Sequence, residues 1–140
     1  MTRPSDEVKR VENDFKPNHP AVALRYFRDK MNFTTGPVEL NSAREKGVEV
    51  QVVDVRDKED FEKGHIPGSV NLPKEQWHSL RNLEHDKMNV VVCYSEVCHL
   101  AARACVYFAN EGFPVMEMDG GFKAWQANGL SVEGAKPKAA

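Results

Sequence analysis

The sequence lacks three features that would each indicate a class of protein: a long apolar run, a strong excess of one charge, and paired cysteines. No apolar run approaches the ~18–20 residues that cross a bilayer, and the charged segment 1–14 has no apolar stretch of a secretory signal peptide. The 19 Lys and Arg residues nearly balance 21 Asp and Glu, which argues against a nucleic-acid binder. We therefore expect a cytoplasmic protein that binds neither membrane nor nucleic acid.

Cysteine is scarce, and its three occurrences lie close together. Cys93, Cys98 and Cys105 follow the spacing C-x4-C-x6-C. An odd number of cysteines without a signal peptide does not suggest a disulfide framework. The spacing also lacks the second pair of ligands that a zinc site needs. We expect no metal and no cofactor, so the question is whether one of these thiols is reactive.

The length and composition are those of one globular domain. The chain has 140 residues, of which 41% are hydrophobic and 29% charged, and single cores typically run from about 100 to 150 residues. Apolar, β-branched runs alternate with segments of helical periodicity, and strands are expected at 48–55, 89–93 and 113–118. This alternation predicts an α/β fold with a parallel sheet covered by helices on both faces.

The two ends of the chain differ in composition from the centre. Residues 1–16 form a polar tail, and the domain itself is expected over residues 17–131, beginning with an amphipathic helix at about 19–33. Residues 132–140 are small and polar, so we expect a disordered C-terminal tail.

Cys93 is the first candidate for chemistry. It ends the run VVVC, and the loop YSEVC separates it from a helix that starts near His99. Sites in open α/β folds lie at the carboxyl ends of strands. Inward backbone N–H groups of such a loop and the helix N-terminus both favour the thiolate, which is the nucleophilic form. We therefore expect Cys93 to react, while a buried structural cysteine is the alternative.

Three segments in combination resemble a single-domain rhodanese. They are VVDVRDKEDFEKGHIPGSVNLP, VVVCYSEVCHLAARA and GFPVMEMDGGFKAWQANG, and the resemblance covers about residues 36–130. It implies a rhodanese-like three-layer sandwich with a five-stranded, mostly parallel sheet. It also implies a sulfurtransferase whose Cys93 takes a sulfane sulfur from a donor such as thiosulfate or a persulfide. The resulting Cys93 persulfide would pass this sulfur to cyanide, to a small thiol or to a protein acceptor.

The resemblance also assigns residues around Cys93. The loop whose amides surround the sulfur corresponds to Tyr94, Ser95, Glu96, Val97 and Cys98, with His99 directly after it. Asp54 and Arg56 match the D-x-R at the end of the preceding strand, and His65 lies in the G-H-I-P-G-S turn. We expect Asp54 to bond the loop backbone and Arg56 to hold the turn or a carboxylate, as structural supports. Asp119, Gly120, Gly121 and Trp125 match the closing segment.

The chain departs from the family pattern in the charge of this loop. Many members carry Arg or Lys where this chain has Cys98, whereas the loop here has Glu96 and no fixed cation. Glu96 would oppose a thiosulfate dianion, which favours a neutral or cationic donor. His99 either assists by protonation or only begins the helix. Cys98 either fills an apolar gap or attacks a persulfide as a resolving thiol, and Cys105 is expected in the core.

Two other functions compete with sulfur transfer. The first is a phosphatase or arsenate reductase on the same scaffold, but such enzymes have a longer loop and an Arg that clamps the anion. The nearest downstream Arg here is Arg103, deep in the expected helix. The second is a non-catalytic module that binds a partner, although such a module would usually have lost the nucleophile that this chain keeps as Cys93.

Overall fold

A five-stranded parallel sheet forms the centre of the computed structural model, which describes residues 15–134. The strand order is β1-β5-β4-β2-β3, and each neighbouring pair is parallel. The expected α/β class is confirmed, with a sheet that is wholly rather than mostly parallel. The strands in chain order are β1 (Thr34–Thr35), β2 (Val50–Asp54), β3 (Val70–Asn71), β4 (Met88–Val92) and β5 (Val115–Met118).

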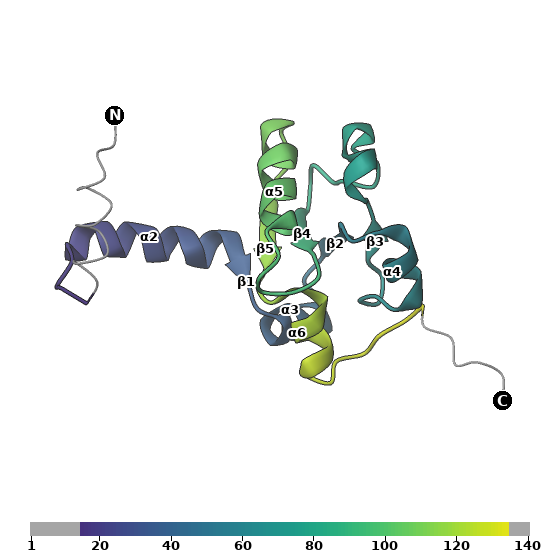
Figure 1. Ribbon diagram of the computed structural model, residues 1–140, viewed down its shortest axis with the longest axis horizontal. Coiled ribbons are helices and arrows are strands. Elements are labelled where there is room, and N and C mark those ends of the chain that lie inside the picture. The colour runs from purple at the N-terminus through teal and green to yellow at the C-terminus, as the bar shows by residue number, and fades with distance from the viewer. Residues whose placement is uncertain (1–14, 135–140) are drawn as a thin grey trace. The chain divides into compact units, whose positions relative to one another are not determined.

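Helices precede, connect and follow these strands (Figure 1). They are α2 (Pro20–Phe33), α3 (Pro37–Glu45), α4 (Lys58–Lys63), the 3-10 helix η1 (Lys74–Ser79), α5 (Leu100–Asn110) and α6 (Gly121–Ala127). The chain divides into two units, Met1–Lys30 and Met31–Ala140. Helix α2 supplies most of the described part of the first unit and has no buried residue. None of the helices within residues 15–134 is long and apolar enough to cross a membrane.

The strands bury side chains on both faces because alternate residues point to opposite sides of the sheet. In β4, Val91 packs with the α5 residues Ala101 and Phe108 on one face. Val90 and Val92 face the other side and pack with residues of α3 and α6 that include Leu40, Phe122 and Trp125. The continuous VVV run therefore reflects a strand covered on both faces, which gives three layers.

The register of the central strands brings their carboxyl ends together. Asp54 at the end of β2 lies opposite Val92 at the end of β4, and Val91 lies opposite Glu117 on β5. Cys93 directly follows β4. The same edge of the sheet therefore carries Cys93, the residues after β2 and the end of β5, as expected for a site at the carboxyl ends of parallel strands.

The segment before the C-terminus differs from the expectation that disorder begins at residue 132. The backbone of Glu133 exchanges hydrogen bonds of 2.9 and 3.0 Å with His65. Its carboxylate accepts a bond of 2.7 Å from the N–H of Gly68. These long-range contacts hold Val132–Gly134, and no local pattern in the sequence indicates them. The rest of the predicted C-terminal tail, 135–140, and most of the predicted N-terminal tail, 1–14, lie outside the described residues.

Candidate active site

Cys93 is almost fully buried at the carboxyl end of β4, with 2% of its surface exposed. The first turn of α6 holds the start of its loop. The N–H of Phe122 donates to the carbonyl of Cys93 at 2.8 Å, and the N–H of Lys123 donates to the carbonyl of Tyr94 at 3.0 Å. These bonds fix the backbone from which the thiol projects.

Gly121 permits this close approach between α6 and the loop. Its φ of +63° lies in the left-handed region, and a Cβ atom there would lie 2.5 Å from the backbone N of Ser95 and 2.8 Å from the carbonyl O of Cys93. Real Cβ atoms do not approach backbone so closely, so position 121 requires glycine both for its conformation and for space. The second glycine of the D-G-G motif therefore has a specific structural role.

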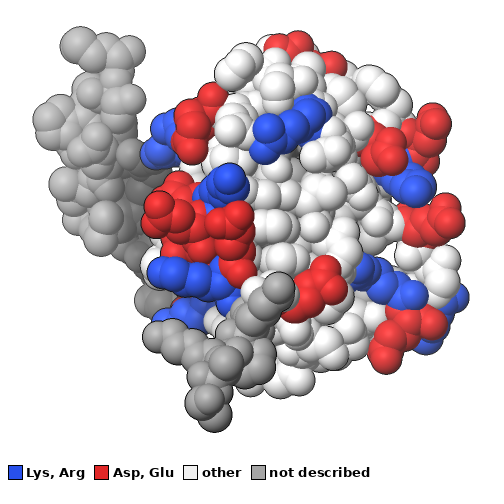
Figure 2. Space-filling model, turned by 90° about the vertical axis from the view of Figure 1, so that its right-hand side faces the viewer, with Lys and Arg blue, Asp and Glu red and all other residues white. Residues whose placement is uncertain are grey.

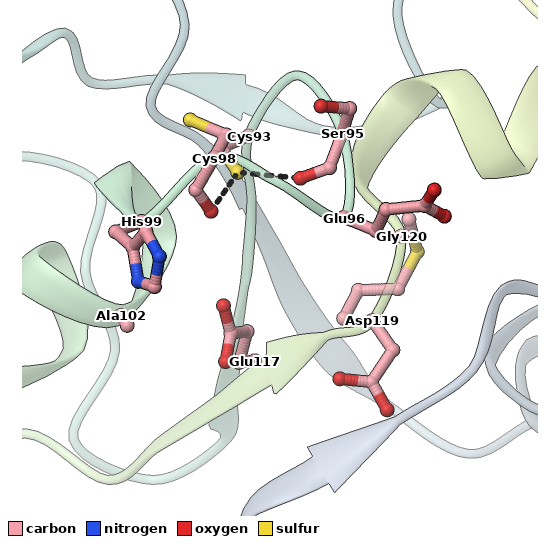
Figure 3. Close-up of a pocket in the computed structure, with 10 residues that line it drawn as sticks. Cys93, Ser95, Glu96, Cys98, His99, Ala102, Glu117, Asp119 and Gly120 are labelled. Carbon is pink, nitrogen blue, oxygen red and sulfur yellow. Dashed lines mark hydrogen bonds between the residues drawn. The ribbon is translucent and has the colours of Figure 1, made fainter. Parts of the chain in front are cut away.

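The loop curls around the sulfur of Cys93 (Figure 3). The N–H of Cys98 donates to the carbonyl of Ser95 at 3.1 Å, closing a tight turn. The Sγ of Cys93 lies 3.7 Å from the carbonyl O of Ser95 and 3.6 Å from that of Cys98, as a thiol that donates weakly to both. The expected inward amides are present only in part, because two carbonyl oxygens face the sulfur as well.

Burial raises the pKa of the Cys93 thiol from 9.0 to about 11. The backbone N–H groups of Ala101, in the first turn of α5, and of Ser95 act in the opposite direction and lower it. The backbone N–H groups of the loop and of the helix terminus therefore lower the pKa of Cys93 and favour the thiolate, as expected. Their effect is smaller than the cost of burying a charge, so the resting group is a neutral thiol.

The other two cysteines have different surroundings. Burial acts to raise the pKa of Cys98, but the N–H of Leu100, the Cys93 thiol and other groups together lower it. In Figure 3 the carbonyl of Cys98 faces the Cys93 sulfur while its own sulfur points away from the cavity, and the side chain packs against the α5 core. Burial raises the pKa of Cys105 to about 12. Cys105 packs against the same core, as expected.

Asp54 and Arg56 form a buried ion pair rather than two separate supports. The Arg56 side chain donates to the Asp54 carboxylate from Nε and Nη2, the latter at 2.8 Å, and Nη2 also donates to the carbonyl of Gly64 at 2.7 Å. The guanidinium lies 4.1 Å from the ring centre of Phe122 on α6. Arg56 thus holds the turn and a carboxylate, as expected, whereas the Asp54 carboxylate bonds Arg56 and not the cysteine loop.

The predicted loop residues Tyr94 and Val97 and the predicted support residue His65 lie outside the cavity beside Cys93. The Tyr94 hydroxyl donates to Asp60 at 2.6 Å and accepts a bond of 3.1 Å from the N–H of Asp57, which ties the loop to the start of α4. His65 stacks on Phe61 with ring centres 3.8 Å apart, and its Nδ1 bonds the Phe61 carbonyl at 2.7 Å. Val97 is largely exposed, at 79%.

A cavity of about 280 Å³ opens beside the Cys93 sulfur. Five residues of the predicted nucleophile and its loop line it, together with five others, of which two belong to the closing segment that the resemblance had matched and three had not been assigned. The first five are Cys93, Ser95, Glu96, Cys98 and His99. Asp119 and Gly120 come from the closing segment, and the unassigned residues are Ala102, Glu117 and Met118. Within residues 15–134, no Lys or Arg lines this cavity, and no group of three His, Cys, Asp or Glu side chains is arranged to hold a metal.

Among the lining residues that the sequence had not indicated, Glu117 is the one with an ionisable side chain. It is half-buried on β5, between β1 and β4, and in Figure 3 it lies across the cavity from the cysteine loop. Burial and the neighbouring Asp119 raise the pKa of its carboxyl, while His99 acts to lower it. A glutamate within an internal strand is unusual, and that was the one sequence signal that could have indicated this residue.

Curated proteins similar in sequence include sulfurtransferases. The thiosulfate sulfurtransferase GlpE of Shewanella oneidensis is 41% identical over 78 residues, which are 54% of this chain and 75% of that protein. GlpE of Pseudomonas syringae is 39% identical over 95 residues, covering 64% of this chain and 83% of the relative. The HTH-type transcriptional regulator Rv0324 of Mycobacterium tuberculosis is 37% identical over 100 residues, 71% of this chain but only 44% of the regulator.

Solved structures show the same fold. The BH2092 protein of Bacillus halodurans matches with a TM-score of 0.77 and 32% identity, covering 84% of this chain and 88% of that one. A rhodanese-like domain protein of Staphylococcus aureus matches with a TM-score of 0.63 and 25% identity, covering 72% and 98%. The family model of the rhodanese-like domain matches residues 37–128, which include the whole sheet after β1 and the Cys93 loop. The chain therefore belongs to the rhodanese-like domain family.

Proposed function

We propose that the protein is a sulfurtransferase that carries sulfane sulfur as a persulfide on Cys93. The observation that supports this most directly is the position of the thiol. It lies at the carboxyl end of β4, within a curled loop, and borders a cavity of about 280 Å³. The N–H groups of Ala101 and Ser95 are close enough to favour negative charge on the sulfur.

Sulfur transfer at this site conserves atoms and electrons and needs no external oxidant. The Cys93 thiolate attacks the outer sulfur of the donor, a new S–S bond forms, and the donor leaves with the bonding electron pair, as sulfite in the case of thiosulfate. An acceptor such as cyanide or a thiolate then attacks the outer sulfur of the persulfide. The S–S bond to Cys93 breaks, and the thiolate is regenerated.

The cavity lining does not favour the phosphatase or arsenate reductase alternative. Those reactions need a positive group to hold an oxyanion. Among the described residues, the only lining side chain able to carry a positive charge is His99, whereas Glu96, Glu117 and Asp119 all line the cavity. The same lining makes thiosulfate a slow donor, so a persulfide donor of lower negative charge fits better.

The other alternative is a non-catalytic binding module. The similarity to part of a transcriptional regulator is compatible with such a role, since a rhodanese-like domain can be joined to other domains. The complete loop around Cys93 supports catalysis instead. A binding role requires neither the thiol nor the cavity beside it.

Mass spectrometry of the intact protein tests the proposal. After incubation with thiosulfate, and in parallel with an alkyl persulfide, the wild-type chain should gain one sulfur atom, and peptide mapping should place it on Cys93. Cys93→Ala should not load, whereas the matched variant Cys105→Ala should load like the wild type. If the wild type gains no sulfur from either donor, or if Cys93→Ala keeps more than about a tenth of the transfer rate, the proposal is wrong.

A further inference from the structure

Three carboxylates line the cavity beside Cys93, and His99 is the one lining side chain among the described residues that can carry a positive charge. Glu117 comes from β5, Asp119 directly follows it, and Glu96 projects from the cysteine loop. Within the part of the chain that the structure describes, none of these three carboxylates forms an ion pair with Lys or Arg. A reaction at Cys93 brings a substrate into this cavity, so the charge of the wall acts directly on that substrate.

Of the three carboxylates, Glu117 is the one whose charge acts most strongly on a substrate in the cavity. It is half-buried, while Glu96 and Asp119 are exposed and are screened by solvent. Burial and Asp119 raise the pKa of its carboxyl although His99 acts to lower it, which means that the charge of Glu117 is only partly compensated. In Figure 3 it faces the loop that carries Ser95 and Cys98. A positive group in the cavity would compensate this charge.

We propose that the acceptor of the Cys93 sulfur is a thiol that carries an ammonium group, and that Glu117 selects it by charge. This inference rests on the proposed sulfurtransferase function and specifies its substrate class. The ammonium group is held by Glu117, with Asp119 and Glu96 adding a weaker negative field. Anionic acceptors are disfavoured by the same groups.

The transfer step conserves atoms and electrons. The thiol of the aminothiol gives up its proton, and its sulfur attacks the outer sulfur of the Cys93 persulfide. The S–S bond to Cys93 breaks, and the Cys93 sulfur leaves with the bonding pair and takes up a proton. The products are the Cys93 thiol and the persulfide of the aminothiol, and no oxidant or reductant is needed.

A pair of acceptors of equal length isolates the effect of charge. Cysteamine carries an ammonium group where 2-mercaptoethanol carries a hydroxyl group. The protein is first loaded with sulfur and desalted, and the rate of persulfide discharge by each thiol is then measured at low ionic strength. The rate ratio of cysteamine to 2-mercaptoethanol is normalised to the same ratio with a free alkyl persulfide, because the two thiols differ in their intrinsic thiolate fraction.

We expect the normalised ratio to favour cysteamine by about tenfold, the effect of one partly screened charge pair. Glu117→Gln should remove most of this preference. Glu111→Gln, which removes an exposed carboxylate outside the cavity, should retain it. In the wild type the preference should also decrease as salt is added, a measurement that does not depend on the folding of any variant.

The outcomes separate this inference from the function on which it rests. A chain that takes up no sulfur on Cys93 overturns both. A chain that loads normally but discharges to both thiols with the same normalised rate overturns only the charge selection. Equal preference in wild type and Glu117→Gln, with both proteins folded, also overturns the assignment of Glu117. A preference that is lost in Glu117→Gln and reduced by salt supports it.

Discussion

The contact between Gly121 and the cysteine loop provides a sharp test of how the site is built. Replacing Gly121 with Ala adds a single methyl group. At φ +63° that methyl group would lie 2.5 Å from the backbone N of Ser95 and 2.6 Å from the carbonyl carbon of Tyr94. Backbone atoms cannot rotate aside as a side chain can, so α6 or the loop must shift.

Two costs add in this variant. A non-glycine residue in the left-handed region costs about 1–2 kcal/mol. Overpacking against backbone costs about a further 1–3 kcal/mol. Gly129→Ala is the matched control, because Gly129 has a φ of +68° but nothing within 4 Å of its would-be Cβ atom. The difference between the two variants isolates the contact with the loop, and we expect Gly121→Ala to be less stable by about 1–3 kcal/mol.

Urea unfolding of both variants measures this difference, and sulfur loading on Cys93 measures its effect on the site. Gly121→Ala should load more slowly than Gly129→Ala under conditions where both are folded, because the displaced loop moves the N–H of Ser95 relative to the thiol. Equal stability of the two variants, or equal loading rates, would show that α6 does not position the loop in the way the hydrogen bonds to Cys93 and Tyr94 indicate.

Three further predictions concern charge. The rate of sulfur loading should rise about tenfold per pH unit from neutral pH toward 11, since burial raises the pKa of Cys93 to about 11 and only the thiolate reacts; a plateau below pH 8 would contradict this. Arg56→Met should lower the free energy of unfolding by about 3–5 kcal/mol in urea titrations, because it leaves the Asp54 carboxylate buried and unpaired. Glu96→Lys should raise kcat/KM for thiosulfate by only about two- to fivefold, because Glu96 is exposed, and added salt should abolish the gain.

Local sequence patterns were sufficient to predict the central strands and the position of Cys93. The β-branched run before Cys93 is buried on both faces because β4 lies inside a parallel sheet. The sequence of such a strand is a continuous apolar run. The loop and the helix that follow this run in the sequence predicted that the Cys93 thiol lies at the end of the strand. Both inferences depend only on neighbours in sequence, which is why they hold.

The cavity wall depends on strand order, which no local pattern determines. Glu117 reaches the site because β5 pairs with β4 and lies beside the loop, although Glu117 comes 24 positions after Cys93 in the sequence. The bonds between Glu133 and His65 are another long-range pairing, and a polar segment after residue 131 gave no sign of them.

The raised pKa of Cys93 and the negative cavity have a common consequence for reactivity. A pKa of about 11 instead of 9.0 lowers the thiolate fraction at neutral pH by about a hundredfold. The more basic thiolate is intrinsically about tenfold more nucleophilic, so the net loss is about tenfold. A positive group bound beside Glu117 would favour the thiolate and thereby offset part of this loss. In the loading step, a donor with an ammonium group would therefore be recognised and would also favour the Cys93 thiolate, whereas an anionic donor would meet a neutral thiol and a repulsive wall. In the discharge step, the ammonium group of the acceptor would stabilise the departing Cys93 thiolate.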